Sequence, residues 1–244
     1  MPLPFAFTKA IRRTLAGERD PDGEAKDADE VRLLRLLKER LHGRLQELIA
    51  RIGWPPDLNR LDSAFWASQE GQLLADLRPE IERMAMASIA SASATVPILW
   101  DEAVIAREAA EWAGTYTYDL VRGLLDNDRA FLQRAIPQFV STPGMTVGDL
   151  RRELTPLFGE RRAQNIAVTE TTRAYAQGRR IVQEDLARGG IRMTRIWRTS
   201  MDERVCPICA GLEDKPESQW GSAPGGPPAH VGCRCWAVLS NMAD

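Results

Sequence analysis

The sequence predicts an α+β protein that is mainly α, with a helical N-terminal body followed by a small Cys/His-rich lobe that contains β-strands. Apolar residues recur at helical spacing through the first two-thirds of the 244 residues. After Gly189-Gly190, β-branched and aromatic residues typical of strands take over. All four cysteines lie beyond residue 205, which sets this last segment apart.

A first long helix is predicted from Asp27, because Glu30 three residues later completes a capping-box pattern. Its apolar stripe consists of Val31, Leu34, Leu37, Leu41, Leu45, Leu48 and Ile52. Gly53 and Pro55-Pro56 should end this helix. We expect the polar residues 17–29 to form a connector.

More helices should follow in the N-terminal two-thirds. Pro79 is expected to open a helix whose small residues, 85–94, allow close packing against a neighbour, and Pro97 should break it. Asp101 is a predicted N-cap for a helix that reaches about Leu125. Thr146 and Asp149 predict one more short helix, which runs to Phe158.

The longest predicted helix of the second half covers residues 160–188. One face of it carries Ala163, Ile166, Ala167, Ala174, Gly178 and Ile181, with Glu170 at the centre. A carboxylate on an apolar face is costly unless it is paired or hydrogen-bonded. We therefore expect Glu170 to have a buried partner.

The remaining chain should form the lobe. Residues 192–199 and 234–239 are predicted strands, and the Gly/Pro-rich residues 221–228 are a predicted loop. We divide the chain into a helical N-terminal region, residues 1–130, and a second region, residues 131–244, which contains the lobe.

Composition excludes several classes of protein. A formal charge of −2 with 44% hydrophobic residues argues against wholesale disorder. The longest uncharged stretch, Met84 to Trp100, is too short and too rich in Ser to cross a bilayer, so no membrane contact is expected. No secretory signal is seen at the N-terminus, which predicts a cytoplasmic protein. Only two histidines occur, which restricts general-base chemistry.

Five soft ligands cluster near the C-terminus: Cys206, Cys209, His230, Cys233 and Cys235. In a reduced compartment this clustering favours a metal over disulfides. A CxxC turn offers two thiolates to one ion, and the His-x-x-Cys-x-Cys arm can complete a tetrahedron. We expect Cys233 and Cys235 to project away from each other, so that only one of them ligates.

Four protein ligands would leave no open position for water, which favours a structural zinc ion over a catalytic one. A Cys206–Cys209 redox pair, disulfides formed outside the cell and a site without metal remain alternatives. An HNH-type nuclease is disfavoured because His230 is the only histidine in the lobe, and no spacing singles out a cysteine protease.

Four ordered motifs resemble those of the phage head morphogenesis family, the minor capsid proteins similar to the F protein of phage Mu and to the minor capsid protein of phage SPP1. They are RRAQNIAVTETTRAY at 161–175, WRT at 197–199, DERVCPIC at 202–209 and PPAHVGCRC at 227–235. The likeness covers about residues 130–239. The family usually has Pro on both sides of the histidine, where this chain has Ala229 and Val231.

The resemblance implies a non-enzymatic minor head protein of a tailed phage or prophage, present in few copies. Its implied partners are the portal protein and the scaffold or major capsid protein, and double-stranded DNA in some members. It would lie in the host cytoplasm during assembly and then in the virion head, inside or near the portal. We further expect Arg234, held between two cysteines, to pair with Glu170 and so dock the lobe on the helix.

Two other functions remain open: an enzyme that processes DNA, and a zinc-dependent DNA-binding module. Residues 151–198 carry 11 Arg and 5 acidic residues, a net charge of +6. The candidates for phosphate contacts are Arg161, Arg162, Arg173, Arg179 and Arg180. They flank the buried face of the helix instead of forming one continuous basic surface, which weakens DNA binding as the main function. The alternative is that these arginines pair with acidic residues of the same chain.

Overall fold

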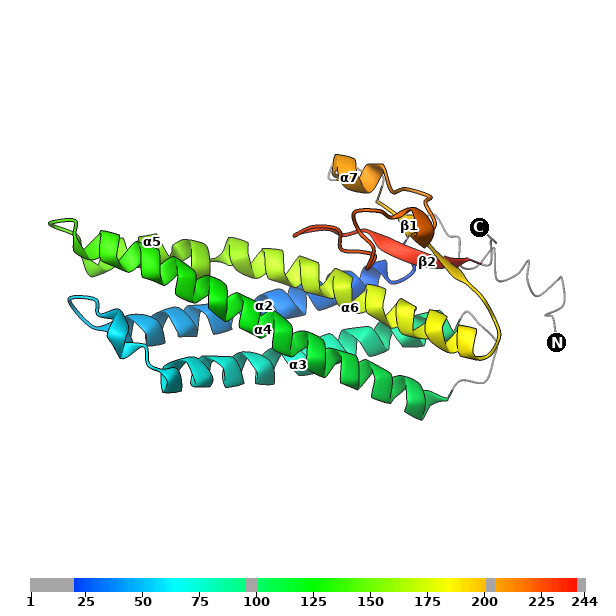
Figure 1. The fold of residues 1–244 in the computed structure, drawn as a ribbon, viewed down its shortest axis with the longest axis horizontal. Coiled ribbons are helices and arrows are strands. Elements are labelled where there is room, and N and C mark those ends of the chain that lie inside the picture. Colours follow the sequence, from blue (N-terminus) through cyan, green and yellow to red (C-terminus); the bar gives the residue numbers. More distant parts are fainter. Residues whose placement is uncertain (1–19, 95–100, 201–204, 241–244) are drawn as a thin grey trace.

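The computed structural model describes residues 20–94, 101–200 and 205–240. Four long helices lie side by side in an elongated bundle (Figure 1): α2 (Gly23–Ile52), α3 (Ser63–Ala94), α4 (Glu102–Val140) and α6 (Glu160–Arg188). The short helices η1 (Leu58–Arg60) and α5 (Val147–Phe158) lie at the end of the bundle farthest from the lobe. The predicted mainly helical α+β class is confirmed.

The lobe is built on a two-stranded antiparallel sheet. Strand β1 (Thr194–Arg198) pairs with β2 (Trp236–Ser240) so that Thr194 lies opposite Ser240. The short helices α7 (Pro207–Ala210) and η2 (Glu217–Gln219) lie in the connection between the strands, and β2 packs against α6. Both predicted strands and the loop between residues 221 and 228 are confirmed.

The predicted apolar stripe of α2 faces the core of the bundle in part: Leu34 and Leu45 are only partly buried, and Leu33, outside the predicted stripe, is buried. Leu33, Leu37, Leu41, Leu48 and Ile52 are buried, whereas the predicted core residue Val31 is 57% exposed. Arg44 occupies a position within the buried stripe and is 3% exposed. Its charge is matched by the fully buried Asp128 of α4, at 2.8 Å.

Two predicted helix starts are wrong, and one helix is longer than expected. Helix α2 begins at Gly23, so Asp27 and Glu30 lie inside it and form no capping box. Pro79 lies inside α3, where packing against α4 and α6 offsets the lost backbone hydrogen bond. Helix α4 continues past Leu125 because Leu132, Ile136 and Phe139 extend its buried face. Pro97 lies outside the described residues.

Three local predictions from capping and residue size are confirmed. Asp101 caps α4 by accepting a hydrogen bond from the amide of Val104, at 3.1 Å. Thr146 and Asp149 form a reciprocal capping box at the start of α5. A Cβ at Gly178 of α6 would lie 2.5 Å from the carbonyl oxygen of Ala85, so the small residues of α3 do allow the two backbones to approach closely.

The expected division between residues 130 and 131 falls inside α4. Buried side chains from both sides of that point share one core, which includes Leu41 and Leu77 as well as Leu150 and Ala163. Among the described residues, no helix is both long enough and apolar enough to cross a membrane.

Candidate metal centre

The first two ligands lie on a tight turn that Cys206 itself organises. Cys206 is the N-cap of α7, and Pro207 occupies the first helical position, where its missing N–H costs nothing. The Cys206 sulfur accepts a hydrogen bond from the amide of Cys209, at 3.4 Å. This turn directs both sulfurs toward one point.

The third and fourth ligands lie on a second turn. The amide of Cys233 donates to the carbonyl oxygen of His230 at 3.2 Å, and Gly232 has a φ of +78°, which favours glycine at this point of the turn. His230 Nδ1 lies 2.9 Å from the carbonyl oxygen of Val231. Since a carbonyl can only accept, Nδ1 carries the proton and Nε2 is left as the metal-binding nitrogen.

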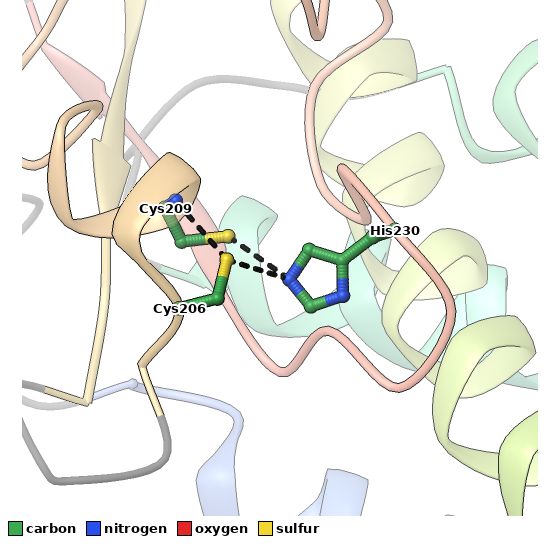
Figure 2. Close-up of side chains that lie close together, drawn as sticks. All are labelled: Cys206, Cys209 and His230. Carbon is green, nitrogen blue, oxygen red and sulfur yellow. Dashed lines mark hydrogen bonds between the residues drawn. The ribbon is translucent and has the colours of Figure 1, made fainter.

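Three of the side chains, Cys206, Cys209 and His230, converge at distances that suit a shared ion, and Cys233 adjoins them through Cys209. Figure 2 shows His230 Nε2 directed at the sulfurs of Cys206 and Cys209, at 3.1 and 3.4 Å. The sulfurs of Cys209 and Cys233 are 3.8 Å apart. Zn–S bonds of about 2.3 Å in a tetrahedron place two sulfurs about 3.8 Å apart. The chemistry of these donors therefore fits zinc, and the spacing of Cys209 and Cys233 matches that of two thiolates on one ion.

The structure corrects the expected orientation of Cys235. Cys209, Cys233 and Cys235 place their sulfurs within 4.8 Å of one another, so all four cysteines gather here. Residues two apart in an extended chain point to the same side, and Arg234 between them points outward. Cys209 belongs both to this group and to the group with Cys206 and His230.

Ionisation differs among the thiols. A hydrogen bond from Cys235 lowers the pKa of Cys233 to about 5. Burial raises the pKa of Cys209 to about 12, and the charge on Cys233 adds to the rise. The hydrogen bond to Cys233, together with burial, raises the pKa of Cys235, which remains a thiol. Cys233 is thus prepared as a thiolate, and Cys235 as its hydrogen-bond donor.

Two threonines of α6 hold the second turn, and sequence reasoning missed them. Thr172 Oγ1 donates to the carbonyl oxygen of Cys233 at 2.8 Å. Thr169 Oγ1 accepts from the amide of Gly232 at 2.9 Å. The run of threonines within the helical motif at 161–175 was a signal, because threonine in mid-helix often makes such side-chain bonds to backbone.

The expected pair between Arg234 and Glu170 is wrong. Arg234 pairs with Glu30 of α2 in a fork, with Nη2 at 2.7 Å and Nε at 3.2 Å from the two carboxylate oxygens. Because Cys233 and Cys235 both point inward, Arg234 points outward and reaches α2. A bidentate salt bridge therefore joins the lobe to the bundle, but it reaches α2 instead of α6.

Glu170 is buried, as predicted, but its partners come from α4 and from its own helix. The hydroxyl of Tyr116 donates to Glu170 at 2.5 Å, and Arg173 Nε lies 3.6 Å away. Burial raises the pKa of Glu170, although Tyr116 and Arg173 oppose the rise. Arg173 also lies over the ring of Tyr116.

The five arginines proposed for phosphate contacts do not form one surface. Arg179 is 3% exposed and pairs with the buried Asp22 at 2.6 Å, so it cannot reach a phosphate. Arg162 bonds Asp128 and the carbonyl of Leu157, and Arg180 bonds Glu184. Arg161 is exposed. Most of the positive charge in this segment is matched within the fold.

Comparison with known families matches one segment of the chain. Residues 133–238 match the family model described as Phage Mu protein F like protein. The comparisons with curated proteins and with solved structures gave no match. The matched range includes α5, α6, both strands and all five soft ligands. The match confirms the predicted resemblance: residues 133–238 are similar to the phage Mu protein F family.

Proposed function

We propose that the chain is a minor head protein of a tailed phage or prophage, acting without catalysis in head assembly next to the portal. The family match over residues 133–238 carries this proposal. The long bundle offers an extended surface for protein contacts, and the lobe adds a rigid element at one end. Its partners would be the portal protein and the scaffold or major capsid protein, first in the host cytoplasm and then in the virion head.

In this proposal the lobe contains a structural zinc ion held by Cys206, Cys209, His230 and Cys233. The contacts between their sulfurs and the imidazole support this set. The ion would cross-link the two turns, which are separated by a long loop and carry few hydrophobic residues. A set of four protein ligands leaves no site for substrate, which supports a non-enzymatic role.

The test is co-assembly. We would express the chain with the portal, scaffold and major capsid proteins encoded beside it, and purify procapsids by sedimentation. The expected result is a few copies of the chain per procapsid, measured by quantitative mass spectrometry, and loss of these copies when the portal gene is omitted. Procapsids that form with the portal and contain none of the chain would contradict the proposal.

DNA binding is the weaker alternative, because Arg161 is the single member of the predicted set that is exposed and for which the described residues show no ion pair. A DNA-binding module would lose affinity steeply between about 50 and 200 mM salt. We expect the chain to bind duplex DNA weakly or not at all under these conditions. A strong, salt-dependent affinity that falls in Arg161→Ala would favour the alternative.

A further inference from the structure

The metal-binding turn has two hydrogen bonds to α6 that leave little freedom in its position. Thr172 binds the carbonyl of Cys233, and Thr169 binds the amide of Gly232. Gly232 and Cys233 belong to the turn that presents His230 and Cys233 as ligands. Both threonines are nearly fully buried, at 7% and 2% exposure, and the bond from Thr172 to Cys233 is itself buried, which strengthens it against competition by water.

The two hydroxyls are themselves oriented by the helix. Thr169 Oγ1 donates to the carbonyl oxygen of Asn165 at 2.6 Å, which leaves its lone pairs free to accept from Gly232. Thr172 gives its proton to Cys233. Since the threonines are three residues apart on one helix, they bind backbone groups of two consecutive residues of the turn, the amide of Gly232 and the carbonyl of Cys233. Helix α6 thus fixes the position of the metal-binding turn.

We propose that Thr169 and Thr172 are positioning residues of the metal centre and couple metal binding in the lobe to the helical bundle. This inference rests on the metal centre of the proposed function. The threonines hold the His230–Cys233 turn in a geometry near the one a bound ion requires. Binding of the ion and docking of the turn on α6 then favour each other, and the linkage is reciprocal.

Thr171 provides a matched control. It lies between the two positioning residues, is equally buried, and its hydroxyl has no hydrogen-bond partner among the described residues. Replacement by Val is nearly isosteric at all three positions. In Thr169→Val and Thr172→Val it leaves a backbone group of the ligand turn without its partner, whereas Thr171→Val leaves that turn untouched.

The experiment measures affinity for Zn²⁺ by competition with a chromophoric chelator, and the absorption spectrum of the Co²⁺-substituted full chain. Removing a group that orients a ligand typically weakens metal binding about 10- to 100-fold. We expect losses of this size, with altered Co²⁺ ligand-field bands, in Thr169→Val and in Thr172→Val. Thr171→Val should bind as the wild type does, and Thr172→Ser, which keeps the hydroxyl, should recover most of the affinity.

The outcomes separate the two proposals. A wild-type chain that takes up neither Zn²⁺ nor Co²⁺ would overturn the metal centre itself. A wild type that binds tightly, with unchanged affinity and spectrum in both positioning variants, would overturn only the coupling. An equal loss of Zn²⁺ affinity in Thr171→Val would also overturn the coupling, since it would show that the substitutions act by general destabilisation of the fold. Helical circular dichroism checks folding, and if one Val variant does not fold, the other and Thr172→Ser carry the test.

Discussion

At the scale of single residues, Cys233 and Cys235 have different roles although only Arg234 separates them. Both are buried near Cys209, but the pKa of Cys233 is lowered to about 5 while that of Cys235 is raised. A metal ligand must be a thiolate. On this basis we expect Cys233 to be the metal ligand and Cys235 to be the thiol that donates a hydrogen bond to it.

Serine substitutions should separate these roles. Cys233→Ser removes a ligand, and we expect the purified protein to lose most of its zinc, measured by native mass spectrometry. Cys235→Ser keeps a hydrogen-bond donor next to Cys233, so zinc should be retained. The reverse pattern would show that Cys235 is the fourth ligand.

Glu170 should make stability depend on pH. Because burial raises its pKa above the ordinary 4.5, the folded state binds the proton more tightly than the unfolded state does. The resulting stabilisation is complete below pH 4.5 and is lost as the pH rises through the raised pKa of the folded state. Glu170→Gln can still accept from Tyr116 but does not ionise.

We therefore expect the melting temperature of the wild type to fall, relative to that of Glu170→Gln, as the pH increases above 4.5. The measurement is thermal unfolding of both proteins over a pH series. A constant difference between them across the series would show that Glu170 has the same pKa in both states.

At the scale of helices, α6 organises the molecule, since it contacts α2, α3 and β2 extensively. The helices are also joined by charges inside the core. Asp128 of α4 bonds Arg44 of α2 at 2.8 Å and Arg162 of α6 at 2.5 Å. Burial lowers the pKa of Arg44, and Asp128 opposes this effect. Asp128 thus keeps a buried guanidinium charged where three helices meet.

Removing Asp128 should be costly. Asp128→Ala leaves Arg44 buried without its counter-charge, and we expect the free energy of unfolding to fall by about 3–5 kcal/mol. Glu184→Ala breaks the exposed pair with Arg180 and should cost less than about 1 kcal/mol. Urea unfolding of the two variants measures both values. Equal losses in the free energy of unfolding would show that the buried pair stabilises the fold no more than the exposed pair does.

At the scale of the whole molecule, the lobe has a hydrophobic cluster of its own, although Leu239 of β2 packs in a cluster with residues of α3, α4 and α6. Trp197 and Trp220 are fully buried in the lobe, edge to face at 5.3 Å, in a cluster with Cys209 and Cys233. The core of the bundle is larger and consists of leucines and other apolar residues of the long helices. We expect the lobe to need the ion, and the bundle to persist without it.

Chelation should therefore change the lobe first. With a strong chelator, tryptophan emission should shift to longer wavelength while the helical circular dichroism is largely retained. The double variant Cys206→Ser/Cys209→Ser should show the shifted emission from the start and no response to chelator. Unchanged emission of the wild type after metal removal would show that the lobe is stable alone.

Local signals predicted much of this structure. The capping residues of α4 and α5, the buried face of α6 and the strand composition of β1 each depend on neighbours in the sequence, and each prediction is confirmed. The predicted starts of helices at Asp27 and at Pro79 were wrong, because packing over whole helices outweighed local preferences. The carboxylate that meets Arg234 was also missed, since Glu30 is about two hundred residues away in the sequence.

The sequence by itself determined the mainly helical class, the segment similar to phage Mu protein F and the five candidate metal ligands, because periodicity, motif order and residue chemistry are written along the chain. Only the tertiary structure decided that Cys235 turns toward Cys233, that Glu30 receives Arg234, and that Thr169 and Thr172 hold the ligand turn. These facts depend on which surfaces of α2 and α6 meet the lobe. Such contacts arise between residues distant in sequence, whose approach is set by the packing of the whole fold.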